Sequence, residues 1–247
     1  MVFRSGNPAL TQTNFSPVYG KEAMTLEGTI AKTMTMLVVV FITGVMAYSI
    51  ISKSPGSAML MMFGGGIGGF VVALIIMFRR PAQPQVLMIT YSLLEGLFVG
   101  AMSYVVENWY IGGSPGVVLQ AMIATVGVFV VMLTLYRYRI IQPTKKFVLA
   151  VVSITGAIML VYLANFVLMM MGTSIPFIHG NGVIGIGFSL LVTGMAALFL
   201  IIDFGVIENG VKNGAPKSME WYGAFGLVVT LIWLYVEMLR LLAKMRD

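Results

Sequence analysis

The sequence is dominated by long stretches that carry no charged residue. The longest runs from Phe147 to Ile202, and it far exceeds the ~20 apolar residues that cross the ~30 Å hydrocarbon core of a bilayer. Charged residues make up only 10% of the chain, and the mean hydropathy is +0.96. Soluble domains, by contrast, are about one quarter charged. The sequence therefore predicts an all-α, polytopic integral membrane protein.

Charged residues and turn-forming residues divide the apolar stretches into seven segments. The longest stretch is interrupted at Gly172–Gly182, where GTSIPFIHGNG combines Gly, Pro, Asn and the single histidine, His179. Residues 1–28 are predicted to form a polar cytosolic tail, because they lack the apolar core of a signal peptide. Residues 29–247 are predicted to form one membrane domain, whose transmembrane helices span approximately residues 33–52, 56–78, 86–106, 117–136, 147–171, 183–210 and 221–245.

The distribution of Lys and Arg indicates the orientation, because these residues concentrate in cytosolic loops. With a cytosolic N-terminus, the cytosolic segments hold 11 of the 15 Lys and Arg residues and the opposite segments hold 4. The N-terminus is therefore predicted to be cytosolic, and seven helices place the C-terminus outside. The basic C-terminal end favours the cytosol, so an alternative is that the last helix does not cross and both ends are cytosolic.

Several classes of function are excluded by what the sequence lacks. There is no cysteine and only one histidine, so a Cys- or His-based metal cluster is excluded. The basic residues lie between apolar runs and form no basic face, which excludes a nucleic-acid partner. No HExxH, GxSxG or GxGD-type motif occurs, so neither an enzyme nor a bound cofactor is expected. The GGGIGG run, Gly64–Gly69, lacks the strand and Lys of a phosphate-binding loop and favours close helix packing.

Three acidic residues inside the predicted helices are candidates for a functional role: Asp203, Glu237 and Glu95. A charged group in the bilayer interior costs a few kcal/mol on insertion scales, so such a group is usually paired, solvated or functional. Glu237 and Arg240 are three residues apart on one helix face and could simply pair with each other. Asp203 could be a solvated helix end near Arg79, and Glu95 could pair with an arginine. These structural explanations remain open beside a functional one.

Four segments carry a resemblance to a known family: GNPAL, MTLEGTIAKT, YSLLEGLFVGAMS and the long, specific DFGVIENGVKNGAPKSMEWYGAFGLVVTLIWLYVEMLRLL. Over nearly the whole chain they resemble the bacterial, YccA-like branch of the Bax inhibitor-1 (TMBIM) family. The resemblance implies seven helices wrapped around a central seventh, in the bacterial cytoplasmic membrane. It also implies a pH-sensitive calcium leak linked to stress responses. The alternative it admits is a stress or quality-control regulator that binds a membrane protease or another membrane partner without transport.

The resemblance further implies a sensor made of two acids that share a proton, on helices six and seven, and an arginine at the end of helix two. The matching residues are Asp203, Glu237 and Arg79, with Arg80 as the neighbouring alternative. Two close carboxyls in a low dielectric cannot both ionise cheaply, and ionised carboxylates suit transient calcium contact. The expected partners are thus the lipid bilayer, protons and calcium as the permeant ion. Direct contact between the two acids requires helix six to continue past Asp203 and the last span to begin near Gly226.

Overall fold

The computed structural model of the chain describes residues 23–112, 115–173, 175, 180 and 182–246. Within these ranges, seven helices are long and apolar enough to cross a membrane. Most of the predicted N-terminal tail, residues 1–22, and His179 lie outside the described residues. The helical elements are α1 (Leu26–Lys53), the 3₁₀ turn η3 (Pro55–Ser57), α2 (Ala58–Arg79), α3 (Gln85–Val105), the π-helical turn η4 (Val106–Tyr110), α4 (Val117–Arg137), α5 (Lys145–Met170), α7 (Val183–Lys212) and α8 (Met219–Arg246).

Two helix boundaries differ from the prediction in ways that matter for the site. α1 begins seven residues early because the Thr25 side chain accepts a hydrogen bond from Gly28 N, which caps the first turn. α7 continues past Asp203 to Lys212, as contact between the two acids requires. The expectation that the last span begins near Gly226 is wrong, because α8 is one helix that already begins at Met219.

The connection between α7 and α8 explains where these two helices end and begin. After α7, Gly214 adopts a left-handed conformation with φ +64°, which glycine tolerates without steric cost. Pro216 follows, and it cannot continue a helix ladder because it lacks an N–H. The chain therefore reverses within six residues, and α7 and α8 pack against each other as an antiparallel pair.

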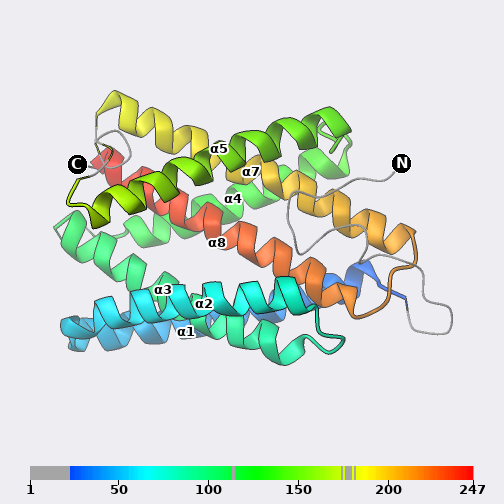
Figure 1. Cartoon of the computed structure of the whole chain (residues 1–247), viewed down its shortest axis with the longest axis horizontal. Coiled ribbons are helices and arrows are strands. Elements are labelled where there is room, and N and C mark those ends of the chain that lie inside the picture. The colour runs from blue at the N-terminus through cyan, green and yellow to red at the C-terminus, as the bar shows by residue number, and fades with distance from the viewer. Residues whose placement is uncertain (1–22, 113–114, 174, 176–179, 181, 247) are drawn as a thin grey trace.

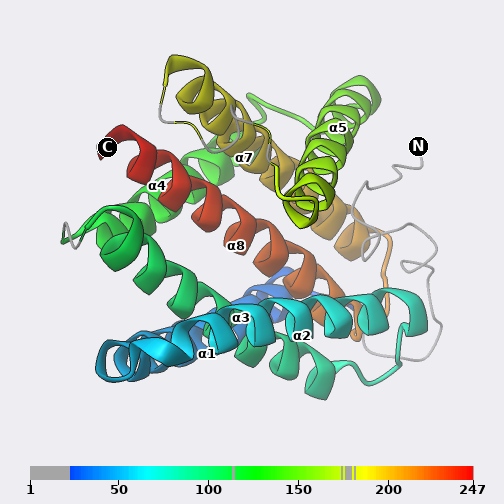
Figure 2. The same cartoon turned by 60° about the vertical axis from the view of Figure 1, so that its left-hand side comes forward.

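The helices form two groups on either side of α8. One is a tight layer of α1, α2 and α3; the other contains α4, α5 and α7 (Figures 1 and 2). α8 packs against α1, α3, α4 and α7. The last helix is thus central, as the resemblance implies, but α7 shares this position, since 78% of the membrane-spanning window is buried in each of the two helices.

Glycines set the close packing of the first three helices. A Cβ atom at Gly65 would lie only 2.6 Å from Leu94 O of α3, and one at Gly69 would lie 2.6 Å from Glu95 Oε1. These glycines belong to the GGGIGG run, so its function as a packing surface is confirmed. On the other side of α3, a Cβ at Gly100 would overlap the Gly44 backbone of α1. The close packing of α1, α2 and α3 therefore depends on glycine at these positions, where a larger side chain would clash with the neighbouring helix.

We predict that Gly100→Ala destabilises the protein by about 1–3 kcal/mol, the usual cost of overpacking. Gly127→Ala on α4 is the matched control, because a Cβ there meets nothing within 4 Å. Alanine is otherwise the better helix former, by about 1 kcal/mol, so the control variant should be as stable as the parent or more stable. Unfolding midpoints in detergent measure both, and equal effects of the two substitutions would contradict the close-packing interpretation.

Candidate functional site

Asp203 of α7 lies in the centre of the bundle with an exposed fraction of 0%. Its Oδ2 atom accepts a hydrogen bond of 2.6 Å from the Thr230 hydroxyl of α8. The same hydroxyl lies 3.2 Å from the carbonyl oxygen of Gly226, one turn earlier on α8. A neutral hydroxyl on the central helix therefore holds the α7 carboxyl in place.

Glu237 of α8 is 2% exposed and belongs to a cluster of three polar side chains. Its two carboxylate oxygens accept hydrogen bonds from the Tyr162 hydroxyl of α5, at 3.2 and 3.3 Å. They also accept from Arg240 Nη1, at 2.9 and 3.0 Å. Arg240 Nη1 lies 2.6 Å from the Tyr162 hydroxyl as well. The alternative explanation of Glu237, pairing with Arg240 on its own helix, is therefore confirmed, and Tyr162 extends the pair to α5.

A second polar contact lies one turn beyond this cluster. Lys244 of α8 is 4% exposed. Its Nζ donates to Ser189 Oγ of α7 at 2.9 Å and to Gly185 O at 3.2 Å. The C-terminal part of α8 is thus tied to α5 through Tyr162 and to α7 through Ser189.

The two contacts between α7 and α8 determine the register of the antiparallel pair. Asp203 lies opposite Thr230, and Ser189 lies opposite Lys244. Glu237 lies seven residues after Thr230, which is about 10 Å along a helix. The structure therefore does not bring the Asp203 and Glu237 carboxyls together. The predicted shared-proton pair is not formed here, because α8 starts at Met219 and carries Glu237 past the level of Asp203.

An apolar layer separates the two acids. It contains residues 196–202 of α7 and 231–236 of α8, in which Leu200 and Leu234 are fully buried. The rings of Phe199 and Trp233 meet edge to face across the layer, with centroids 6.3 Å apart. The Tyr235 hydroxyl is 2.7 Å from the Ser103 hydroxyl and so faces α3. The layer is about 10 Å thick, as the register requires, and along α7 and α8 it places mostly apolar side chains between the two acids.

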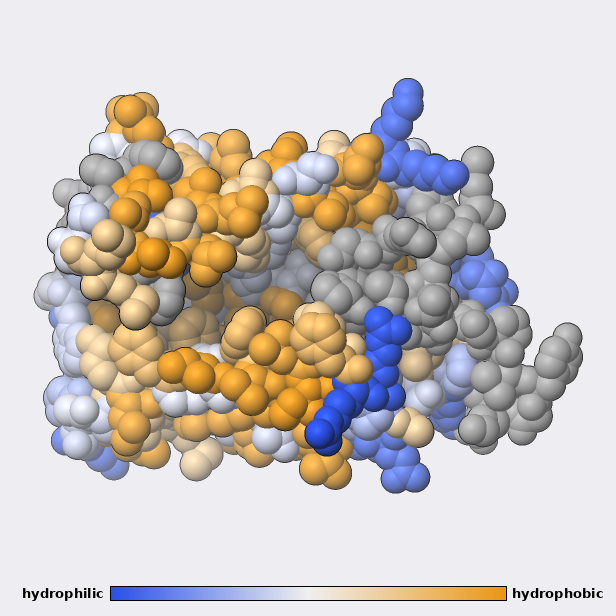
Figure 3. Space-filling model, viewed as in Figure 1, coloured by the Kyte–Doolittle hydropathy of each residue, from blue (hydrophilic) through white to orange (hydrophobic). Residues whose placement is uncertain are grey.

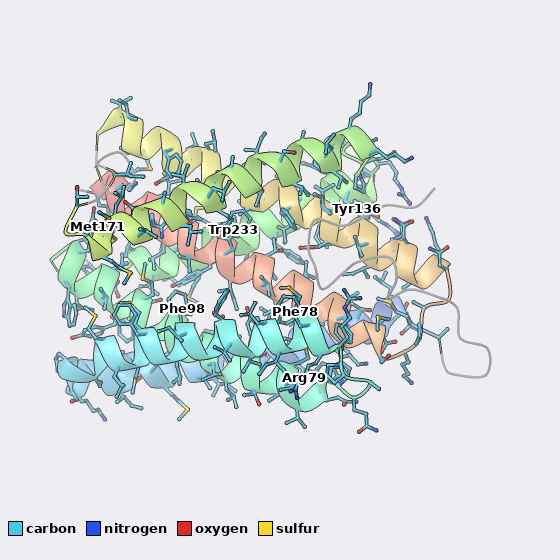
Figure 4. All side chains as sticks on the ribbon, in the orientation of Figure 1. Phe78, Arg79, Phe98, Tyr136, Met171 and Trp233 are labelled. Carbon is cyan, nitrogen blue, oxygen red and sulfur yellow. The ribbon has the colours of Figure 1, made fainter. Side chains whose placement is uncertain are left out.

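The predicted arginine does not reach Asp203. Arg79 is exposed at the end of α2 (Figure 4), and none of the hydrogen bonds and ion pairs found among the described residues involves it. Arg80 is also exposed; its backbone is left-handed with φ 44°, and its Nε donates to Met77 O at 3.3 Å. Arg79 and Arg80 lie at the end of α2, which packs mainly on α3. This places them on the far side of α8 from the centre of α7, where Asp203 lies.

Glu95 lies on α3, half-buried against α2. Its carboxylate occupies the space that the missing side chain of Gly69 leaves, and the Tyr91 side chain lies near it. Among the described residues, none of the ion pairs found joins Glu95 to an arginine. Glu95 thus lies at the interface between α2 and α3 and is not part of the contact between α7 and α8.

Calcium binding by a fixed cage of acids is not supported. Among the described residues, no group of three or more His, Cys, Asp or Glu side chains is placed to hold a metal ion. Asp203 and Glu237 lie at different levels, so each offers calcium one carboxylate at a time.

The family model described as Bax inhibitor 1 like matches residues 7–247. The chain belongs to this family. A search of curated proteins found no match. The family match extends over all seven helices, so the departures described above are features of a Bax inhibitor 1 like protein and not of an unrelated bundle.

Sequence analysis missed one buried acid of this Bax inhibitor 1 like protein. Glu220, with an exposed fraction of 0%, is paired with Lys32 of α1. It also accepts hydrogen bonds from the backbone N and the hydroxyl of Thr25, both at 2.9 Å. The interaction joins MTLEGTIAKT to MEWYGAFG, two segments that carried the resemblance. The acidic residue in the first turn of the last helix was the available signal, and its partner lies 188 residues away.

We predict that Glu237 and Arg240 are energetically coupled by about 1–3 kcal/mol, as contacting residues in one network can be. The measurement is a double-mutant cycle of Glu237→Gln and Arg240→Gln, with unfolding by SDS titration from mild detergent. Glu208 and Lys212 provide a control pair four residues apart at the more exposed end of α7. Such exposed helix pairs contribute about 0.3–0.5 kcal/mol. Equal coupling in the two cycles would contradict the buried cluster.

Proposed function

We propose that this chain is a pH-sensitive calcium leak protein and that the conformation described above is its closed one. The observation that supports the proposal is the placement of two carboxyls inside the bundle, on the central α7–α8 pair. Intramembrane acids are costly, face bundle interiors or water-filled cavities, and mark ion pathways. Asp203 and Glu237 have this placement, and the apolar layer between them accounts for a closed state.

The carboxyls and hydroxyls would serve as successive oxygen contacts for calcium. Calcium prefers hard oxygen ligands and tolerates variable geometry. Asp203 and the Thr230 hydroxyl would supply oxygens at one level, and Glu237 and the Tyr162 hydroxyl would supply them at the other. Conduction then requires the apolar layer to open, and the Phe199–Trp233 contact lies within this layer.

Changes in protonation would couple pH to this opening. Glu237 faces Tyr162, Arg240 and Lys244, so a change in its charge alters the attraction that holds α5 and α8 together. Asp203 faces the Thr230 hydroxyl, so a change in its charge acts on the α7–α8 contact. Local charge changes of this kind shift the balance between two packings of the same helices.

The proposed orientation has a cytosolic N-terminus in the cytoplasmic membrane of a bacterium. The starts of α1 and α8 and the end of α7 lie at one end of the bundle (Figure 1). Six basic residues lie in loops or at helix ends at this same end: Arg79, Arg80, Arg137, Arg139, Lys145 and Lys146. Cytosolic loops are enriched in Lys and Arg, which supports the assignment of this end to the cytosol and of the C-terminus to the outside.

We predict that the purified protein, reconstituted in liposomes, admits calcium at rates that differ between acid and neutral pH. Asp203→Asn carries no charge at either pH, so at both it should give the rate that the parent shows at acid pH. Glu237→Gln should change the rate because it removes the partner of Arg240. An encapsulated calcium dye measures entry.

Glu27→Gln is the matched control, because Glu27 is an exposed acid in the first turn of α1, and it should behave like the parent. Absence of calcium entry at both pH values would refute the leak. The alternative, a regulator that binds a membrane protease or another membrane partner without transport, would then remain. Entry that is unchanged in both Asp203→Asn and Glu237→Gln would refute the roles of these residues.

A further inference from the structure

One face of α8 is left partly uncovered between the two groups of helices. Four residues of α8 are half-buried where almost all their neighbours are buried: Val229, Trp233, Val236 and Arg240. Their spacing of four, three and four residues places them on one stripe of the helix. α2 packs mainly on α3, and α5 packs mainly on α7, so neither helix packs along the whole stripe. α5 reaches it at Arg240, through Tyr162. We call the depression above these four residues the α8 groove.

The groove is visible on the molecular surface. Figure 3 shows a hollow between two apolar bands, which Figure 1 identifies as α5 with α7 on one side and α2 on the other. Figure 4 places Trp233 on α8 between these bands. The groove opens sideways, toward the position of the lipid, and three of the four α8 residues that define it, Val229, Trp233 and Val236, are apolar.

Arg240 gives the groove one charged end. Its side chain is 29% exposed. The hydrogen bonds described for it, to Glu237 and Tyr162, all come from Nη1. The edge of the guanidinium formed by Nε and Nη2 is not used by these bonds. A guanidinium edge matches two oxygens of a phosphate, which explains why arginine is preferred at such sites.

The depth of Arg240 matches the phosphate level of a bilayer. Glu220, paired with Lys32, lies at the opposite end of α8, and Arg240 follows it by 20 residues. This separation is about 30 Å along a helix, equal to the thickness of the hydrocarbon core. Val229, Trp233 and Val236 lie between, at the depth of the acyl chains. The apolar floor of the groove therefore matches the acyl chains of a phospholipid, and its cationic end matches the phosphate.

We propose that the α8 groove binds a phospholipid with net negative charge from the leaflet at the C-terminal end of α8. One acyl chain lies along Val229, Trp233 and Val236, and the phosphate is bound by the free edge of Arg240. A zwitterionic choline lipid fits less well, because its quaternary ammonium lies close to the guanidinium and the two positive charges repel. The inference does not depend on calcium conduction.

The test uses the fluorescence of Trp233 in a Trp109→Phe, Trp221→Phe background, so that Trp233 is the sole tryptophan. The protein is reconstituted in phosphatidylcholine vesicles that contain a fixed fraction of lipid with brominated chains, either phosphatidylglycerol or phosphatidylcholine. Bromine quenches tryptophan only at close range. We expect a roughly fivefold preference for phosphatidylglycerol, equivalent to about 1 kcal/mol for one basic residue.

Two variants locate the binding site. Arg240→Gln should abolish the preference while brominated phosphatidylcholine still quenches Trp233, which shows that the groove remains formed and open. Arg246→Gln is the control, because Arg246 is an exposed arginine at the same end, bonded to Gln120; it should keep the preference. Equal quenching by both lipids in the parent would mean bulk lipid without selectivity. Absence of quenching would mean that another protein surface covers the groove. Either result, or a preference retained in Arg240→Gln, would overturn the proposal.

Discussion

The antiparallel register between α7 and α8 determines the rest of the structure. Both helices are mostly buried, and both carry polar groups that must be satisfied where water is scarce. The Thr230 hydroxyl donates to Asp203 Oδ2, and Ser189 contacts Lys244 fourteen residues further along each helix. In this register, Glu237 lies midway between the two contacts and accepts hydrogen bonds from Arg240 and Tyr162. The central polar groups of the protein thus form two levels with an apolar layer between them.

Part of this arrangement could be predicted from the sequence, because it depends on local features. The number of helices follows from apolar stretches, the packing of α2 on α3 follows from the GGGIGG run, and the Glu237–Arg240 pair follows from a spacing of three. The register could not be predicted, since it depends on where α8 starts, and Met219 lies seven residues before the expected Gly226. A helix carries side chains about 1.5 Å further for each residue, and Glu237 lies seven residues, about 10 Å, beyond Thr230, which contacts Asp203. The Glu220–Lys32 pair, across 188 residues, is likewise a property of the folded bundle.

The proposed leak and the proposed lipid site meet at Arg240. Its Nη1 binds Glu237 and Tyr162, and these bonds do not use the Nε and Nη2 edge of the guanidinium. A phosphate on that edge and a carboxylate on Nη1 share one positive charge, so each weakens the attraction of Arg240 for the other. In this proposal, lipid occupancy and protonation of Glu237 would be linked through one side chain. α5 is attached to α8 through the same cluster, which makes it the helix whose position responds to both.

The central claim is that a dry layer closes the path between the two acids, and thiol accessibility tests it most directly. The chain contains no cysteine, so a single introduced cysteine reports on one position. Leu234→Cys places the thiol inside the layer, where the native side chain is fully buried, and Met245→Cys places it at a position that is 64% exposed. Vesicles are held at whichever of the two pH values, acid or neutral, gives the lower calcium entry. A membrane-impermeant thiol reagent should then label Met245→Cys and leave Leu234→Cys unlabelled. Labelling of Leu234→Cys at the rate of Met245→Cys would contradict the account.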